Sequence, residues 1–231
     1  MATIAPPEPK RSSGSGGNEA RLPPLDGYGG DDGRGGPAGL SLRRYYTGMW
    51  FALAPIVMLF TAFTSAYVVR QGLSQDWTST DLPSIVWWNS LILLASSGAM
   101  EMARRKARGI AGRSRSGMVA WPDLSGSLRR WLLVTSVLGM GFLAGQIEAW
   151  RQLARKGIYL ATNPSSSFFY LLTATHGLHL LGGVAALLAI TALVARRLTP
   201  GRRTGVAVTA IYWHFMDLLW IYVLLLMTVL R

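Results

Sequence analysis

The sequence predicts an all-α polytopic membrane protein, a bundle of five transmembrane helices preceded by a disordered N-terminal tail. Half of the 231 residues are apolar and only 15% are charged. The charged residues are concentrated in short stretches between long uncharged ones, and five such apolar stretches approach the ~20 residues that a helix needs to cross a bilayer. Because backbone amides in lipid have no water to bond, each span is expected to be helical.

The composition also excludes several classes of site. The absence of cysteine excludes disulfides, iron–sulfur clusters, thiolate zinc sites and a cysteine nucleophile. The net charge of +12 could indicate a nucleic-acid-binding protein. However, the basic residues lie between apolar spans rather than in a stripe with aromatic residues. No nucleic-acid partner is therefore predicted.

The first 42 residues differ in composition from the rest of the chain. Glycine, proline, serine and charged residues dominate residues 1–42, as in the runs at 12–17 and 29–33. Such a segment buries too little apolar area to offset the entropy of ordering it. The sequence predicts a disordered cytoplasmic tail over 1–42 and a membrane domain over 43–231.

The first two spans differ in apolar character. Residues 49–69 carry no charged side chain, whereas residues 84–102 form the weakest span. Trp87 and Trp88 near its start suit the headgroup region of a membrane. Four polar residues interrupt it: Asn89, Ser90, Ser96 and Ser97.

The remaining three spans are more regular. Residues 131–148 are preceded by Arg129 and Arg130 and followed by Trp150. The spans at 168–194 and 206–230 are long enough to tilt within the membrane.

The distribution of positive charge predicts the orientation. Twelve Lys and Arg residues lie in the connections at 103–130 and 195–205, against five on the opposite side, counting the last residue. Basic connections stay in the cytoplasm, so the N-terminus is expected in the cytoplasm and the C-terminus outside.

Few ionisable side chains remain within the spans, and such groups usually face a bundle interior. They are His176 and His179 in the fourth span, His214 and Asp217 in the fifth, and Glu101 and Glu148 near span ends. Residues three apart share one face of a helix. A hydrogen bond from either histidine of the fourth span to Asp217 is therefore available between neighbouring antiparallel helices.

Three interpretations of this cluster compete. Ligation of haem would need one histidine from each of two helices, such as His214 opposite His176 or His179, whereas the Glu-x-x-His pairs of di-iron sites are missing. A proton relay is the second interpretation. The third, which we favour, is that these side chains hold helices together. Small residues at Gly141 and Gly145 likewise indicate close helix packing.

Four strings of sequence, in this order, resemble subunit III of the haem–copper oxidases, the cytochrome c oxidase family. They are residues 145–150 (GQIEAW), 166–170 (SSFFY), 175–179 (THGLH) and 212–220 (YWHFMDLLW). Asn89 and Ser90 in the second span are also similar to that family. The resemblance covers about residues 45–231, in the short five-helix bacterial form.

This resemblance implies a non-catalytic subunit of the bacterial plasma (inner) membrane with a periplasmic C-terminus. Haem and copper would lie in partner subunits, and this chain would hold no cofactor, no metal and no catalytic residue. It would contact the catalytic subunit I, share a complex with subunit II, bind phospholipid and support proton uptake during O2 reduction. The residues expected at helix interfaces or near lipid are His176, His179, His214, Asp217, Glu101, Gln146, Glu148, Trp213 and Trp220.

One position departs from the family pattern. Many members carry a glutamate after a serine in the helix that matches the first span, whereas Ser65 is followed here by Ala66 and Tyr67. This difference favours a structural and lipid-binding role for that helix over proton collection.

Alternative functions remain open at this point. Within the family, the chain could belong to a quinol oxidase or serve as an accessory subunit of nitric oxide reductase. From another class, a stand-alone transporter or haem-binding membrane protein is conceivable. A transporter is expected to show inverted repeats and broken helices, and neither is visible in the sequence.

Overall fold

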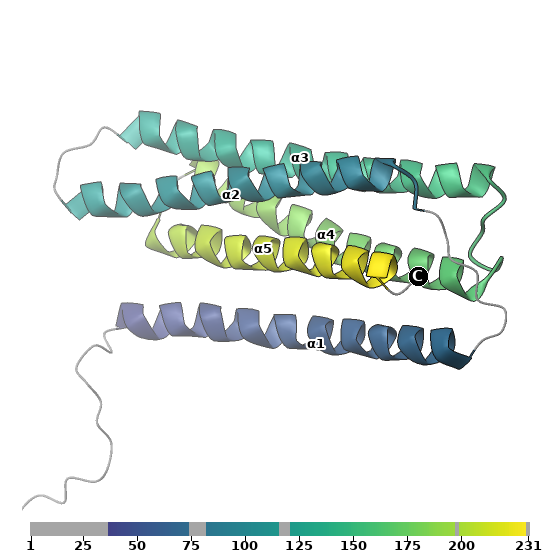
Figure 1. The fold of residues 1–231 in the computed structure, drawn as a ribbon. Helices are drawn as coiled ribbons and strands as arrows, with labels where there is room; N and C mark the ends of the chain where they lie inside the picture. The colour runs from purple at the N-terminus through teal and green to yellow at the C-terminus, as the bar shows by residue number, and fades with distance from the viewer. Residues whose placement is uncertain (1–36, 74–81, 116–120, 197–198, 230–231) are drawn as a thin grey trace, which may run out of the picture.

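The computed structural model describes residues 37–73, 82–115, 121–196 and 199–229. These residues form five helices and no strand, which confirms the all-α architecture (Figure 1). The helices are α1 (Pro37–Leu73), α2 (Ile85–Arg115), α3 (Trp121–Arg155), α4 (Pro164–Arg196) and α5 (Pro200–Val229).

Helices α2 to α5 form a closed four-helix bundle. Helix α2 packs against α3 and α5, α3 packs against α4, and α4 packs against α5. Helix α1 lies outside this bundle and contacts α4 and α5 (Figure 1). Large side chains fill the interior, including Phe142, Trp213 and Trp220, each of them at most 1% exposed.

Among the described residues, four helices are long and apolar enough to cross a membrane by length and composition. These segments are Arg44–Leu73, Gly126–Arg155, Pro164–Arg196 and Gly201–Val229. Helix α2 is outside this set. Its polar residues near Asn89 and Ser96, and its basic C-terminal half, lower its mean hydropathy.

The helices extend beyond the predicted spans. Helix α1 begins at Pro37, so residues 37–42, which were assigned to the tail, belong to a helix; residues 1–36 lie outside the described part of the chain. The basic segment expected as a connection is also largely helical, because α2 continues to Arg115 and α3 already begins at Trp121. Hydropathy indicates where the membrane ends, but it does not indicate where a helix ends. Residues such as Ala, Arg and Lys have high helix propensity and continue a helix into water at little cost in free energy.

The connection between α3 and α4 is fixed at its α3 end by a glycine cap. Gly157 has a φ of 78°, the left-handed conformation that glycine adopts without steric cost. Its N–H donates to the carbonyl of Ala154, and the N–H of Ile158 donates to the carbonyl of Leu153, both over 3.0 Å. These two bonds form a Schellman motif, which satisfies carbonyls at the end of the helix.

The α4 end of this connection is capped by side chains. The Asn163 carboxamide oxygen accepts a 2.7 Å hydrogen bond from the Ser166 N–H, and the Asn163 N–H donates to the Ser166 hydroxyl over 3.2 Å. Pro164 follows the cap at the first helical position, where its missing N–H costs nothing. Both ends of residues 156–163 are therefore held by local bonds.

Candidate functional site

Polar side chains join α2 to α5 inside the bundle. The Trp213 indole N–H donates to the Ser96 hydroxyl over 3.0 Å, and the Trp220 indole N–H donates to the Ser90 hydroxyl over 2.9 Å. Ser97 Oγ lies 2.5 Å from His214 Nδ1. The serines that weaken the second span are therefore the hydrogen-bonding partners of the fifth.

The α2–α5 interface ends in a group of charges. The Glu101 carboxylate accepts hydrogen bonds from Arg104 Nε at 2.6 Å and from Arg105 Nε at 3.1 Å. His214 Nε2 lies 3.8 Å from the same carboxylate. Because the Glu101 side chain is 25% exposed, solvent screens these ion pairs.

The hydrogen bond expected between α4 and Asp217 is not formed. His179 Nδ1 donates instead to the carbonyl of Thr175 in its own helix, over 2.8 Å. Helices α4 and α5 are joined by a different bond, because the Tyr212 hydroxyl donates to the carbonyl of His179 over 2.8 Å.

His176 lies at the centre of the bundle among aromatic side chains. Its ring centroid is 5.9 Å from that of Phe142 and 5.1 Å from that of Trp220. It is fully buried, and neither ring nitrogen has a hydrogen-bond partner within the described protein. The two carboxylate oxygens of Asp217 also lack a partner there.

Gln146 and Glu148 on α3 have different surroundings. Gln146 is 2% exposed, and its side-chain amide has no partner among the described groups. Glu148 lies on the surface, with its carboxylate 3.3 Å from Arg155 and 3.9 Å from Arg151. Of these two predicted residues, Gln146 is therefore the one in the bundle interior.

Glycines on α3 allow close contact with two other helices. A Cβ built at Gly145 would lie 2.0 Å from Asn89 Oδ1, and one built at Gly139 would lie 2.6 Å from the Trp213 ring. At Gly141 the nearest atom, from Ile92, would be 3.9 Å away. The predicted close approach is therefore found at Gly145, whereas Gly139 was missed because it belongs to no paired motif.

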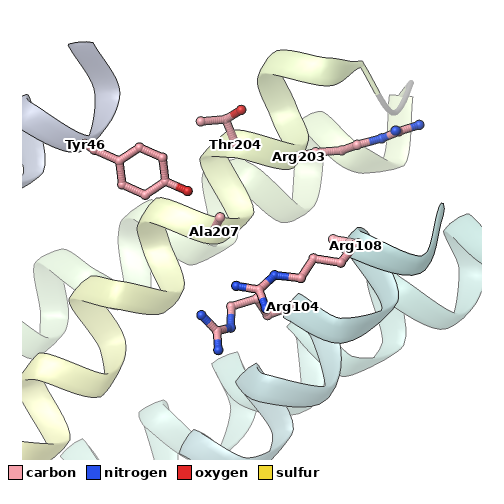
Figure 2. A pocket seen from close by; sticks show the side chains of 7 residues that line it. Tyr46, Arg104, Arg108, Arg203, Thr204 and Ala207 are labelled. Atoms are coloured by element: carbon pink, nitrogen blue, oxygen red, sulfur yellow. The ribbon is translucent and has the colours of Figure 1, made fainter. Parts of the chain in front are cut away.

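A basic pocket of about 200 Å³ opens at one end of the bundle (Figure 2). Figure 2 shows that Tyr46 comes from α1, Arg104 and Arg108 from α2, and Arg203 and Thr204 from α5. Its full lining is Tyr46, Arg104, Ala107, Arg108, Arg203, Thr204 and Ala207. The sequence indicated these arginines only as markers of orientation, because residues from three helices meet here only once the chain folds.

No cluster of metal-binding side chains is found in the part of the chain that the structure describes. Groups of three or more His, Cys, Asp or Glu that could surround an ion do not occur there. Of the three histidines, two make hydrogen bonds and the third packs between aromatic rings. The arrangement provides helix–helix contacts and one basic pocket.

Comparison with known proteins connects this architecture to a family. A family model described as cytochrome c oxidase subunit III matches residues 48–230. A cytochrome c oxidase subunit 3 from Thermostichus vulcanus is 31% identical over 187 residues, which cover 75% of this chain and 81% of that relative. A quinol oxidase subunit 3 from Bacillus spizizenii is 27% identical over 183 residues, covering 76% of this chain and 82% of the relative.

A second group of relatives matches over a shorter length. A probable cytochrome c oxidase subunit 3 from Mycobacterium bovis is 34% identical over 133 residues, 57% of this chain and 59% of the relative. The match therefore spans less than two thirds of the mycobacterial protein. The family model, in contrast, extends from within α1 to the end of α5. The chain belongs to the cytochrome c oxidase subunit III family and is a subunit III of a haem–copper oxidase.

Proposed function

We propose that this chain is the subunit III of a cytochrome c oxidase of the aerobic respiratory chain, and that its role is structural. It packs against the catalytic subunit I, shares the complex with subunit II and binds phospholipid. It supports proton uptake during O2 reduction by keeping subunit I intact. Haem and copper reside in the partner subunits, and no redox centre or catalytic residue lies in this chain.

The bonding of the interior polar groups carries this proposal. The hydroxyls of Ser90 and Ser96 accept from tryptophans of α5, and His214 is engaged by Ser97. Side chains used in this way hold helices together inside lipid. Large apolar residues such as Leu178 and Val137 lie on the exterior, each 68% exposed, where lipid or a partner subunit covers them.

We propose cytochrome c as the electron donor of the complex, with quinol as the alternative. Relatives named as cytochrome c oxidase subunits reach 31% and 34% identity, against 27% for the relative named as a quinol oxidase subunit. The difference favours cytochrome c. Purification of the native complex and assay with each reduced donor distinguish the two.

The proposed topology has five crossings, with the N-terminus in the cytoplasm and the C-terminus in the periplasm of the inner membrane. Helix α2 packs along both α3 and α5, which are apolar enough to cross. Ser90 and Ser96 bond inward to α5, and Asn89 is buried, so lipid does not meet these polar residues. A helix enclosed in this way crosses with its neighbours despite its lower hydropathy.

The basic pocket supports the proposed binding of phospholipid. It lies where the apolar segments of α1 and α5 begin, at Arg44 and Gly201, which is the depth of lipid headgroups. Guanidinium groups bind phosphate through paired hydrogen bonds. Replacing Arg108 and Arg203 with glutamine is expected to reduce the phospholipid that copurifies, measured by native mass spectrometry. Arg105→Gln is the control, because Arg105 does not line the pocket.

The structural role is tested by Ser96→Ala in the assembled oxidase. Loss of this hydroxyl leaves the buried Trp213 indole N–H without its acceptor, so it is expected to lower the yield of the complex while leaving the haem absorption spectrum of the remaining complex unchanged. Glu148→Ala is the control, since Glu148 is a surface residue. A shifted haem spectrum in the Ser96 variant contradicts the proposal, as does stoichiometric haem, iron or copper in the chain purified alone.

A further inference from the structure

Four buried polar residues, one from each helix of the four-helix bundle, have side-chain atoms without a hydrogen-bond partner in the described protein. These atoms are Asn89 Nδ2, both amide atoms of Gln146, both ring nitrogens of His176 and both carboxylate oxygens of Asp217. None of the four residues is more than 5% exposed. We refer to Asn89, Gln146, His176 and Asp217 as the polar layer.

Contacts between helices give the relative depths of the α2 and α5 members. The hydrogen bond from Trp220 to Ser90 sets these two residues level with each other. Asn89 directly precedes Ser90, and Asp217 is three residues before Trp220. Because α2 and α5 run antiparallel, these two offsets add, and at 1.5 Å per residue Asn89 and Asp217 are about 6 Å apart along the bundle axis, slightly more than one turn.

The α3 and α4 members belong to the same level. His176 packs against Trp220, with ring centroids 5.1 Å apart. Gly145 of α3 lies directly against Asn89, and Gln146 follows Gly145. Four helices therefore each contribute one unpartnered polar side chain within about one helical turn of depth.

An isolated polar group is unfavourable in such a place, and proteins satisfy buried polar groups with other protein groups or with bound water. A buried water makes two to four hydrogen bonds to groups that otherwise lack partners. The polar layer provides both donors and acceptors, and it provides them from every side of the bundle. We propose that the four-helix bundle binds ordered water molecules at this level, held by Asn89, Gln146, His176 and Asp217.

A line of polar side chains connects the polar layer to the basic pocket. The Ser97 hydroxyl contacts His214, which lies one helical turn before Asp217 on the same face of α5. His214 in turn approaches Glu101, which is bonded to Arg104, one of the residues that line the pocket. The bound water exchanges with bulk water along this line, from the end of the bundle that carries the pocket.

The test is X-ray hydroxyl-radical footprinting of the purified full-length chain with the partners it retains, in ¹⁸O-labelled water. Radiolysis of a bound water modifies the side chains around it even when they are shielded from solvent. Phe142, which contacts His176, is expected to be modified several-fold more than Phe169, although the two are 0% and 2% exposed. Equal modification of the two phenylalanines would overturn the proposal and mean that the polar groups satisfy one another directly.

Two pairs of variants test the position of the bound water and its exchange route. Gln146→Leu is expected to lower the modification of Phe142 several-fold, whereas Gln152→Leu, on the same helix but outside the polar layer, leaves it unchanged. Ser97→Ala is expected to slow the exchange of ¹⁸O for ¹⁶O at Phe142 after rapid mixing. Ser136→Ala, at a buried serine that bonds its own helix, is the control. An unchanged exchange rate in Ser97→Ala overturns the proposed exchange route. If a variant fails to fold, the comparison of Phe142 with Phe169 in the wild-type protein still tests whether water is bound.

Discussion

Replacing Gly145 with alanine tests the packing of α3 against α2. The new Cβ would lie 2.0 Å from Asn89 Oδ1, 2.6 Å from its Cγ and 2.7 Å from its Nδ2, so Asn89 would have to move. Asn89 is 2% exposed, so its carboxamide cannot simply turn out of the bundle. Overpacking of this kind costs about 1–3 kcal/mol. Gly145→Ala is expected to destabilise the fold by that amount.

Gly141, one turn earlier on the same helix, provides a matched control. There the added Cβ meets only a carbon of Ile92 at 3.9 Å, an ordinary van der Waals contact. Alanine is also the better helix former by about 1 kcal/mol, so Gly141→Ala is expected to be neutral or stabilising. The assay is unfolding by SDS in mixed micelles, followed by tryptophan fluorescence, for both single variants.

The double variant Asn89→Ala with Gly145→Ala provides a second measurement. Removing the Asn89 carboxamide removes the clash, so the two substitutions together are expected to cost less than the sum of their separate effects. Equal stability of the Gly145 and Gly141 variants, or simple additivity in the double variant, would show that the α2–α3 contact at Gly145 is not as close as described.

Three further predictions concern other parts of the molecule. Trp220→Phe removes the hydrogen bond to Ser90 and is expected to lower stability by about 1 kcal/mol in the same SDS assay, because both groups are interior partners. Glu101→Gln removes two ion pairs at a partly exposed position, so it is expected to cost less than about 1 kcal/mol, and the difference from wild type should vanish at high salt. Because the chain has no cysteine, Ser84→Cys and Gly109→Cys can each be labelled with a thiol reagent that does not cross the membrane. If α2 crosses the membrane, the two cysteines are expected to be labelled from opposite sides. Labelling of both from the same side would mean that α2 does not cross and that the protein has four crossings.

The helices were predictable from sequence, but their ends were not. Apolar runs located all five helices, since lipid requires a regular backbone wherever it surrounds the chain. The same signal ends at the membrane surface, and therefore missed residues 37–42 of α1 and 103–115 of α2. Outside the membrane, the helix ends depend on helix propensity and, at the start of α1, on a proline. Neither changes the hydropathy in a way that would reveal where the helix ends.

The partners of the polar residues were harder to predict. Spacing placed His214 and Asp217 on one face of α5, and proximity in sequence suggested α4 as the facing helix. In the structure this face meets α2, where Ser97 contacts His214. Hydropathy treats a serine in a span as a weak point, whereas its hydroxyl is an acceptor that a tryptophan or histidine of another helix can use. Which helices become neighbours depends on the closing of the bundle, and single-sequence patterns do not contain that information.

The capped connection between α3 and α4 also matters for the order in which the protein is made. Its two caps use only residues between Leu153 and Ser166, so this helical hairpin acquires its turn before α5 has been synthesised. The bonds of this turn therefore require no contact with α5, whose residues are added later. A reporter or affinity tag inserted at residues 157–163 would disturb both caps together, and that turn is the position to avoid when the protein is engineered for expression.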